Sequence, residues 1–308
     1  MQTYQKKSIR VSRMKPAVIV DQACAKVPGF KELYNELKRS ITIRGQSESA
    51  LANYSRQLAH LAIYYNRMPL ELQADEVMDY LFHLKSTESI SDSFFNFTIH
   101  GMRYACKMRG MPYTQFSLPE IKSPKQLPIV LNGSEIKTML KACHILKYRL
   151  MIAICYGCGL RSSELQYLQV SHIDTVRKML HIHQGKGSKD RCVPLGNLLC
   201  RGIEQYLVEE IPSKYMFISH FGKPYTTAGI AWVVKQAVTK AGIQKDVHTH
   251  TLRHSYAIHL LENGVNIMHI KELLGHKSIE STMIYLRVAQ PVCSPAVNPL
   301  DVLYGIKE

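Results

Sequence analysis

Three prolines divide the chain into two parts. Pro119, Pro124 and Pro128 lie in the stretch "SLPEIKSPKQLPIVLNGSE". Each lacks the backbone N–H that a helix interior uses and disfavours helix at the residue before it, so this stretch favours an extended conformation. The chain of 308 residues is long enough for two domains with separate cores. The sequence therefore predicts two domains joined by a linker at residues 117–128.

The first domain is predicted to be helical. Apolar residues recur at i, i+3, i+4 and i+7 in four runs, which are "FKELYNELKRSI", "SALANYSRQLAHLAIYYN", "ADEVMDYLFHLK" and "SFFNFTIHGMRYACKM". Ser47 or Ser49 can cap the second run, and Ser91 or Asp92 can cap the fourth. We expect a four-helix domain at residues 30–116, preceded by a basic arm at residues 1–29.

The second domain, at residues 129–308, is predicted to combine helices with a small sheet. The stretch "KMLHIHQGKGSKDRCVPL" has the pattern of a strand, a turn and a strand. Helical patterns surround it, beginning near Ser134, Lys147, Ser162, Ile203, Thr227, Leu252, Ile267 and Ser278. The expected fold class is therefore mainly α with a small β-sheet.

The charge of the chain favours a polyanionic partner. The formal net charge is +15, and residues 1–127 carry 18 Lys and Arg against 11 Asp and Glu, whereas residues 128–308 carry 21 against 13. Because both parts are basic, nucleic acid bound between them is the expected partner. The eight cysteines lack the spacing of a secreted disulfide domain, and no apolar run has the length of a membrane helix. We expect a cytoplasmic, nucleoid-associated bacterial protein that does not use a membrane.

Familiar cofactor motifs are incomplete in this sequence. "GCGLRS" lacks the third glycine of a dinucleotide-binding turn, and in "GKGSKD" Gly187 follows Lys186 where a P-loop requires Ser or Thr. His250 and His254 have the spacing of two zinc ligands, but the glutamate of that motif is missing. We expect no nucleotide cofactor and no metal. Cys155 and Cys158 are interpreted as buried structural thiols.

One simpler interpretation is a DNA-binding protein without chemistry. "HLLENGVNIMHIKELLGHKS" fits a helix-turn-helix, because Gly264 can end one helix and Asn266 can cap the next. This interpretation leaves unexplained why Arg161, Lys186 and Arg253 lie at turns and helix starts.

Cleavage of a phosphodiester without a metal would require such residues. Two guanidinium groups would neutralise the nonbridging oxygens, a lysine would protonate the leaving oxygen, imidazoles would bond the phosphoryl oxygens, and a hydroxyl would attack. The sequence supplies Arg161, Lys186, His250, Arg253, His276 and Tyr285. Each also has an ordinary alternative, such as a pair between Arg161 and Glu164 or a packed core position for His276.

The second domain resembles the catalytic domain of tyrosine recombinases over residues 127–288. The matching segments are "YGCGLRSSEL", "GKGSKDRCVPLG", "HTLRHSYAIHLLENG" and "LLGHKSIESTMIY". The first domain resembles the core-binding domain of that family. The resemblance implies a site-specific recombinase that acts as a homo-tetramer on double-stranded DNA. It implies these roles: Arg161 and Arg253 bind the phosphate, Lys186 is the general acid, His250 and His276 are active-site histidines, and Tyr285 is the nucleophile that forms a 3′-phosphotyrosyl bond.

The sequence departs from the family pattern at three places without removing a catalytic group. Cys158 stands where Thr or Ser is usual, Thr249 where proline is common, and Leu286-Arg287 where Thr-His is frequent. The tail "SPAVNPLDVL" is similar to integron integrases, but the stretch from Lys186 to His250 is too short for their extra insertion. The expected protein is therefore a relative of integron and Xer recombinases rather than a true integron integrase.

Several alternatives stay open at the level of sequence. The biological role is integration or excision of a mobile element, or Xer-like resolution of chromosome dimers; a type IB topoisomerase and a catalytically silent accessory protein are the rivals. Lys189 is a second candidate for the catalytic lysine. The residues expected to contact DNA are Arg44, Arg56, Lys107, Arg109, Lys189 and Arg191, and the ordinary alternative for the first four is a solvated surface.

Overall fold

The computed structural model describes residues 16–88, 90–112, 127–183 and 190–289, and it divides into two compact units. The N-terminal unit comprises residues 1–125 and the C-terminal unit residues 126–308. Most of the expected linker, through residue 126, lies outside the described residues. Each unit has its own hydrophobic core, as two domains require.

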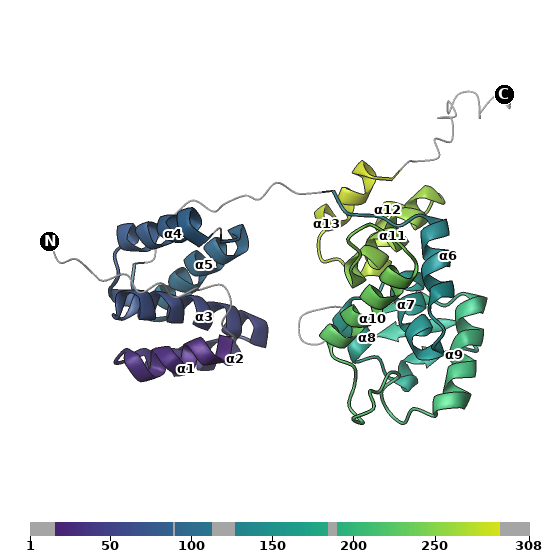
Figure 1. Cartoon of the computed structure of the whole chain (residues 1–308), viewed down its shortest axis with the longest axis horizontal. Helices are drawn as coiled ribbons and strands as arrows, with labels where there is room; N and C mark the ends of the chain where they lie inside the picture. The colour runs from purple at the N-terminus through teal and green to yellow at the C-terminus, as the bar shows by residue number, and fades with distance from the viewer. Residues whose placement is uncertain (1–15, 89, 113–126, 184–189, 290–308) are drawn as a thin grey trace. The chain divides into compact units, whose positions relative to one another are not determined.

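The N-terminal unit is a bundle built around one central helix. Its helices are α1 (Pro16–Lys26), α2 (Phe30–Ile43), α3 (Glu48–Tyr65), α4 (Ala74–Glu88) and α5 (Asp92–Met108), with a short 3-10 helix, η2 (Pro69–Glu71). α3 packs against α1, α2 and α5 (Figure 1). The four helices predicted from periodicity are confirmed as α2 to α5.

Two of the predicted helix caps are confirmed. The Ser47 hydroxyl accepts a hydrogen bond from the Ala50 N–H, and the Ser91 hydroxyl accepts one from the Phe94 N–H. Each bond satisfies a backbone donor that the first turn of a helix leaves free.

Helix α1 corrects the expectation that residues 1–29 form an arm. Its apolar residues Ile19, Ala23 and Val27 are buried in the core of the N-terminal unit, where α1 packs on α3. Residues 16–26 therefore belong to the folded unit. The rest of the expected arm, at residues 1–15, lies outside the described residues.

The C-terminal unit surrounds a three-stranded antiparallel sheet with helices. The strands are β1 (Ile173–Asp174), β2 (Met179–Ile182) and β3 (Arg191–Pro194), paired in the order β1-β2-β3. The helices are α6 (Gly133–Ala142), α7 (Leu146–Gly157), α8 (Ser162–Gln166), α9 (Asn197–Glu210), α10 (Thr227–Lys240), α11 (Thr249–Glu262), α12 (Ile267–Leu274) and α13 (Glu280–Met283), with 3-10 helices η4 (Val170–His172) and η5 (Ile284–Arg287). The predicted class, mainly α with a small sheet, is confirmed.

Strands β2 and β3 form the predicted pair. Leu180 lies opposite Val193, and both are buried. Arg191 is two residues before Val193, so its side chain lies on the same inward face. The turn between the strands, residues 184–189, lies outside the described residues, and with it Lys186 and Lys189.

Helix α11 is central to the C-terminal unit, because it contacts α7, α10, α12 and η5 (Figure 1). Gly264 after α11 has φ +80°, and the Asn266 side chain caps α12 through the Met268 N–H. Both features are as predicted for a turn between two helices. Cys155 and Cys158 are fully buried free thiols, and burial raises the pKa of both.

Candidate active site

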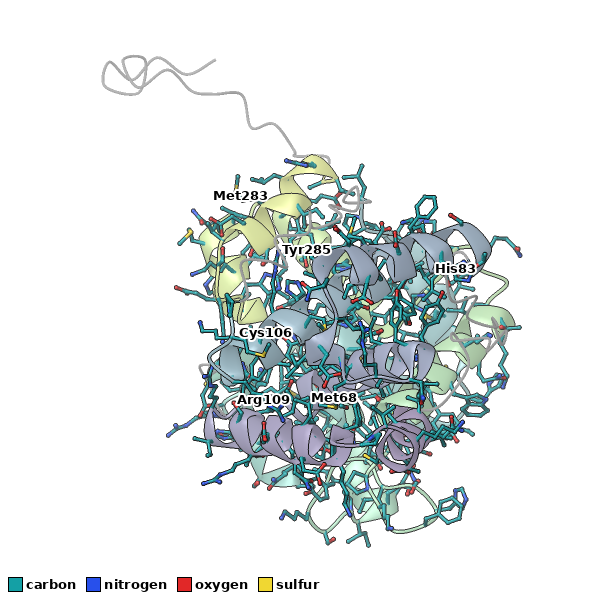
Figure 2. All side chains as sticks on the ribbon, turned by 90° about the vertical axis from the view of Figure 1, so that its left-hand side faces the viewer. Met68, His83, Cys106, Arg109, Met283 and Tyr285 are labelled. Carbon is teal, nitrogen blue, oxygen red and sulfur yellow. The ribbon has the colours of Figure 1, made fainter. Side chains whose placement is uncertain are left out.

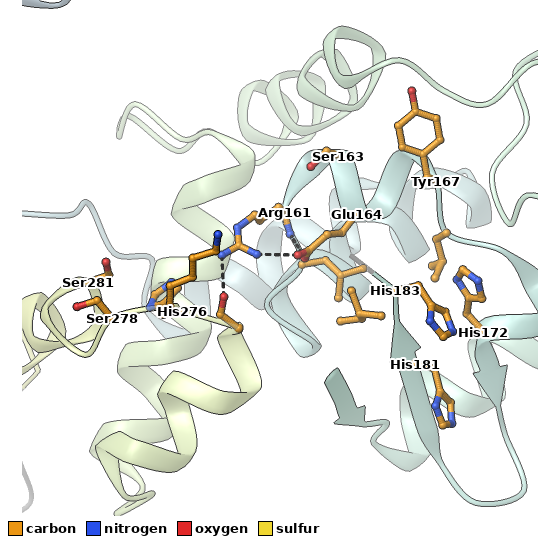
Figure 3. Close-up of a pocket in the computed structure, with 15 residues that line it drawn as sticks. Arg161, Ser163, Glu164, Tyr167, His172, His181, His183, His276, Ser278 and Ser281 are labelled. Atoms are coloured by element: carbon orange, nitrogen blue, oxygen red, sulfur yellow. Dashed lines mark hydrogen bonds and ion pairs between the residues drawn. The ribbon is translucent and has the colours of Figure 1, made fainter. Parts of the chain in front are cut away.

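The loop before α8 places one arginine and requires one glycine. Gly159 has φ +60°, and a Cβ there would lie 2.6 Å from a ring carbon of Tyr256, so a larger residue fits only if the surroundings move. The Gly159 carbonyl accepts a hydrogen bond from Arg253. Two residues later, Arg161 immediately precedes α8 and projects its guanidinium toward Glu164 (Figure 3).

Glu164 is a buried carboxylate shared by several arginines. Its oxygens accept hydrogen bonds from Arg161 Nη1 at 2.7 Å and from Arg191 Nη1 and Nη2 at 2.9 and 2.7 Å. Arg253 Nη1 lies 3.8 Å from Glu164 Oε2. Burial raises the pKa of Glu164, but the hydrogen bonds and charge of Arg191, followed by those of Arg161, lower it to about 2. Glu164 is therefore an anion at neutral pH.

The C-terminal end of α12 binds the same three arginines. Three consecutive carbonyl groups each accept one bond: Leu273 from Arg191 Nε at 2.7 Å, Leu274 from Arg253 Nη2, and Gly275 from Arg161 Nη2 at 3.3 Å. The last carbonyls of a helix lack partners within it and carry partial negative charge, so guanidinium groups suit them.

The cluster carries more positive than negative charge. Three guanidinium groups surround one carboxylate, and Arg253 is only 2% exposed. Burial, followed by the charge of Arg161, lowers the pKa of Arg253 to about 10, so it stays a cation at pH 7. Such a cluster is suited to binding an anion with oxygens that two arginines can share.

Tyr285 lies in η5 with its side chain 1% exposed. Figure 2 labels it on the yellow C-terminal segment, next to Met283. The Tyr285 hydroxyl lies 3.1 Å from His254 Nδ1. The Tyr285 ring stacks on the His276 ring, with 6.4 Å between the ring centres. Burial raises the pKa of Tyr285, and the charges of Arg253 and Arg161 oppose that rise, so the phenol belongs to the same electrostatic cluster.

Two further histidines border the cluster. The Nδ1 atom of His276 lies 2.9 Å from the Thr282 hydroxyl, and burial, followed by the nearby arginines, lowers its pKa to about 4. His250 is the second residue of α11, and its ring centre lies 6.4 Å from that of His254. Partial desolvation, then Arg253 and Arg161, lowers the pKa of His250. A neutral imidazole can donate one hydrogen bond and accept another.

An open cleft of about 790 Å³ adjoins the cluster (Figure 3). Arg161, Glu164 and His276 line one part of it, and His172, His181 and His183 line the part beside the sheet. The residues that line the cleft do not include Tyr285. An anion in the cleft would therefore reach the arginine side of the cluster first.

The structure brings five of the six predicted catalytic residues into one cluster. These are Arg161, His250, Arg253, His276 and Tyr285. The ordinary alternative for Arg161, a pair with Glu164, is also present. Two residues of the cluster were not predicted as site residues: Glu164, which the sequence offered only as a pairing partner, and His254, which it offered only as a metal ligand.

Arg191, one of the expected DNA contacts, points into the C-terminal unit. It is 9% exposed, and its guanidinium binds Glu164 and the Leu273 carbonyl inside the unit. The period-two alternation of β3 carried the signal, because a residue two positions before the buried Val193 also points inward. Arg191 therefore links Glu164 to the C-terminal end of α12.

The four expected contacts in the N-terminal unit differ in their surroundings. Arg44 is exposed, with its guanidinium 5.6 Å from the Tyr104 ring centre, and Arg109 pairs with Glu36 at 2.9 Å. Lys107 is exposed in the last turn of α5, and Arg56 is half-buried within α3.

The described residues contain neither a membrane-spanning helix nor a cluster of metal ligands. Among the described residues, no helix is long and apolar enough to cross a membrane. Over the same residues, no group of three or more His, Cys, Asp or Glu side chains is arranged to hold a metal ion.

Comparisons with known proteins agree on one family. The model of the phage integrase family matches residues 130–291. The chain is 33% identical to tyrosine recombinase XerA of Thermococcus onnurineus over 91% of this chain and 99% of that protein. It is 29% identical to a putative integrase/recombinase, y4qK, of Sinorhizobium fredii over 88% of this chain and 89% of that protein. Among solved structures, the Tn1549 transposon integrase, determined with a circular intermediate DNA, is similar with a TM-score of 0.68, 15% identity, and coverage of 82% of this chain and 94% of that one.

Proposed function

The chain belongs to the phage integrase family of tyrosine recombinases, and from this premise we propose that it cleaves and rejoins duplex DNA at specific sites with Tyr285 as the nucleophile. The phenol oxygen attacks a backbone phosphorus and forms a 3′-phosphotyrosyl bond, while the bond from phosphorus to the 5′ oxygen breaks. The 5′ hydroxyl of a partner strand then reverses the step. Because the phosphotyrosyl ester conserves the bond energy, no nucleotide cofactor is consumed.

One observation carries this proposal. Segments far apart in the sequence place two arginines and a phenol in one buried, positively charged cluster, and the charges of both arginines act on the phenol. Phosphoryl transfer depends on positioning and on stabilising charge at the phosphate oxygens. Arg161 and Arg253 would supply that charge, His250 and His276 would add hydrogen bonds, and Lys186, with Lys189 as the second candidate, would protonate the 5′ oxygen.

The burial of Tyr285 has a mechanical consequence. With 1% of its side chain exposed, a DNA phosphate reaches the hydroxyl only after neighbouring side chains move. His276 both stacks on Tyr285 and lines the cleft, so its ring is the first that we expect to shift.

The test is covalent trapping on a nicked suicide substrate, from which the 5′ fragment escapes and leaves the protein attached to DNA. Wild-type protein should form the adduct, and Tyr285→Phe should form none while binding DNA with unchanged affinity. Tyr156→Phe is the matched control and should still form the adduct, because the Tyr156 hydroxyl also lies beside a histidine of α11, His259, but does not line the cleft. An adduct with Tyr285→Phe, or wild-type protein that binds without forming one, would contradict the proposal. Wild-type protein that binds DNA without forming an adduct would instead support a catalytically silent accessory protein.

We assign the DNA contacts of the N-terminal unit to Arg44, Arg56, Lys107 and Arg109. We propose that the active assembly is a homo-tetramer bound to two duplexes. We expect it to act in the bacterial cytoplasm, at the nucleoid. Each phosphate contact that is lost should lower the slope of log affinity against log salt by about 0.9. A tetramer would appear by light scattering only when paired sites are present.

The biological role has two candidates. We favour integration or excision of a mobile element. Xer-like resolution of chromosome dimers is the second candidate, favoured by relatives that are 31–33% identical and are named XerA and XerD. An assay of strand exchange between two recombination sites on one plasmid distinguishes a recombinase, in either role, from a type IB topoisomerase. A topoisomerase would relax the plasmid without exchanging strands.

A further inference from the structure

His254 lies within hydrogen-bonding distance of the Tyr285 hydroxyl. Its Nδ1 atom lies 3.1 Å from the hydroxyl oxygen, and the two ring centres are 5.7 Å apart. His254 lies in α11 immediately after Arg253, so the same helical turn presents one group to the phosphate site and the other to the phenol.

The surroundings of His254 keep its ring neutral. Burial is the largest cause, followed by the nearby His250 and Arg253, and together they lower the pKa of His254 to about 4. The titratable and charged groups that face it are His250 and Arg253 from α11, Tyr285 from η5 and His276 from the turn after α12. A neutral imidazole with its proton on Nε2 leaves Nδ1 as an acceptor, and the phenol is then the donor.

We propose that His254 is a further catalytic residue, which holds the Tyr285 hydroxyl proton before attack and accepts it as the bond from the phenol oxygen to phosphorus forms. This inference rests on the proposed function. Tyr285 loses its proton to His254 Nδ1 and gains the phosphorus, and the 5′ oxygen leaves phosphorus with a proton from a separate acid. Because the donated hydrogen points at His254, the lone pairs of the phenol oxygen remain free to attack.

The basicity of His254 should rise when DNA binds. A phosphate anion between Arg161 and Arg253 offsets positive charge that disfavours the imidazolium form. The proton acceptor would therefore become effective only with a phosphodiester in place, which suits a nucleophile that must not react earlier.

The chain contains a matched control for this contact. His259, in the same helix, has its Nδ1 atom 2.9 Å from the Tyr156 hydroxyl. In single-turnover trapping on the suicide substrate, His254→Ala should slow adduct formation by about 100-fold or more, the usual size of a general-base effect. His259→Ala should stay within about threefold of wild type, on the expectation that a histidine–tyrosine pair outside the cluster contributes only to packing.

A second variant and a second substrate separate catalysis from misfolding. His254→Asn keeps an acceptor for the phenol but cannot hold a proton, so it should fold as wild type, remain slow, and lose the acid limb of the pH–rate profile. A substrate with sulfur in place of the bridging 5′ oxygen needs no acid for its leaving group. It should rescue Lys186→Ala and leave both His254 variants slow. Rescue of the His254 variants, or wild-type rates for them, would overturn the proposal.

The contact itself can be tested without DNA. In protein labelled with ¹⁵N-histidine, long-range ¹H–¹⁵N spectra should show His254 neutral at pH 7 with the proton on Nε2. Tyr285→Phe should shift the His254 Nδ1 resonance and Tyr156→Phe only that of His259. An unchanged His254 resonance refutes this inference while the recombinase function stands. Failure of wild-type protein to trap DNA refutes the function instead, and the catalytic role of His254 with it.

Discussion

Replacing Glu164 by Gln should destabilise the C-terminal unit by about 3 kcal/mol. The neighbours of Glu164 lower its pKa from 4.5 to about 2, which corresponds to about 3 kcal/mol of stability at pH 7. The variant would also leave three guanidinium groups without their shared anion, and breaking a buried pair costs about 3–5 kcal/mol. The glutamine amide would in addition direct N–H donors at guanidinium donors.

Urea unfolding followed by tryptophan fluorescence measures this loss. Trp232 is the single tryptophan of the chain and lies in α10 of the C-terminal unit, so its signal reports on that unit. With a slope of about 2 kcal/mol per M, the midpoint should fall by about 1.5 M. Glu209→Gln is the control, because Glu209 is exposed on α9, and it should change stability by less than about 0.5 kcal/mol.

The pH dependence supplies an independent check with a definite sign. Because the folded pKa of Glu164 lies below 4.5, its contribution is full above that pH and is lost as the pH falls toward 2. At pH 3.5 the difference between wild type and Glu164→Gln should narrow to about 2 kcal/mol. If the variant unfolds at the same urea concentration as Glu209→Gln, Glu164 does not hold the arginine cluster together.

Three other changes have definite expected outcomes. Gly159→Ala should destabilise the C-terminal unit by about 3 kcal/mol or more, because this position has a positive φ and a Cβ there would overlap Tyr256. Gly264→Ala should cost about 1 kcal/mol, because that position has a positive φ but open space around it. Thermal unfolding of the two variants compares their stabilities. Arg191→Met should lower stability by about 3 kcal/mol by the same urea assay without changing the salt dependence of DNA binding, and a lower salt slope would restore Arg191 as a DNA contact. Burial, followed by the charge of Arg56, lowers the pKa of His60 to about 3, so the N-terminal unit should lose stability as the pH falls below 6.5. In His60→Leu, acid unfolding followed by circular dichroism should show a smaller loss of stability. A loss equal to that of wild type would exclude His60 as its source.

The sequence predicted the helices well because their signals are local. Period-3.6 patterns located α2 to α5, and serines before two of them acted as the caps that their chemistry favours. Helix α1 was missed because it follows a basic stretch, and only its packing against α3 distinguishes it from an arm. Arg161 and Arg253 were predicted as site residues because phosphodiester cleavage requires two guanidinium groups and because their segments resemble motifs of tyrosine recombinases.

The rest of the site depends on contacts that the sequence does not encode locally. Glu164 looked like a partner of Arg161 alone, since its bonds to Arg191 come from a strand 27 residues away. His254 contacts Tyr285 only because η5 brings the tyrosine to it across 31 positions of sequence. Residue type identifies groups that can carry charge or protons, but the tertiary fold determines which of them meet.

The three carbonyls at the end of α12 affect the entropy cost of binding an anion at the arginine cluster. They hold the guanidinium groups of Arg161, Arg191 and Arg253 in place through hydrogen bonds within the C-terminal unit. The rotamer entropy of these long side chains, up to about 2 kcal/mol each, is thus lost when the chain folds. In the proposed function the surface that receives the phosphate is therefore preorganised, and little of the association free energy has to be spent on ordering it.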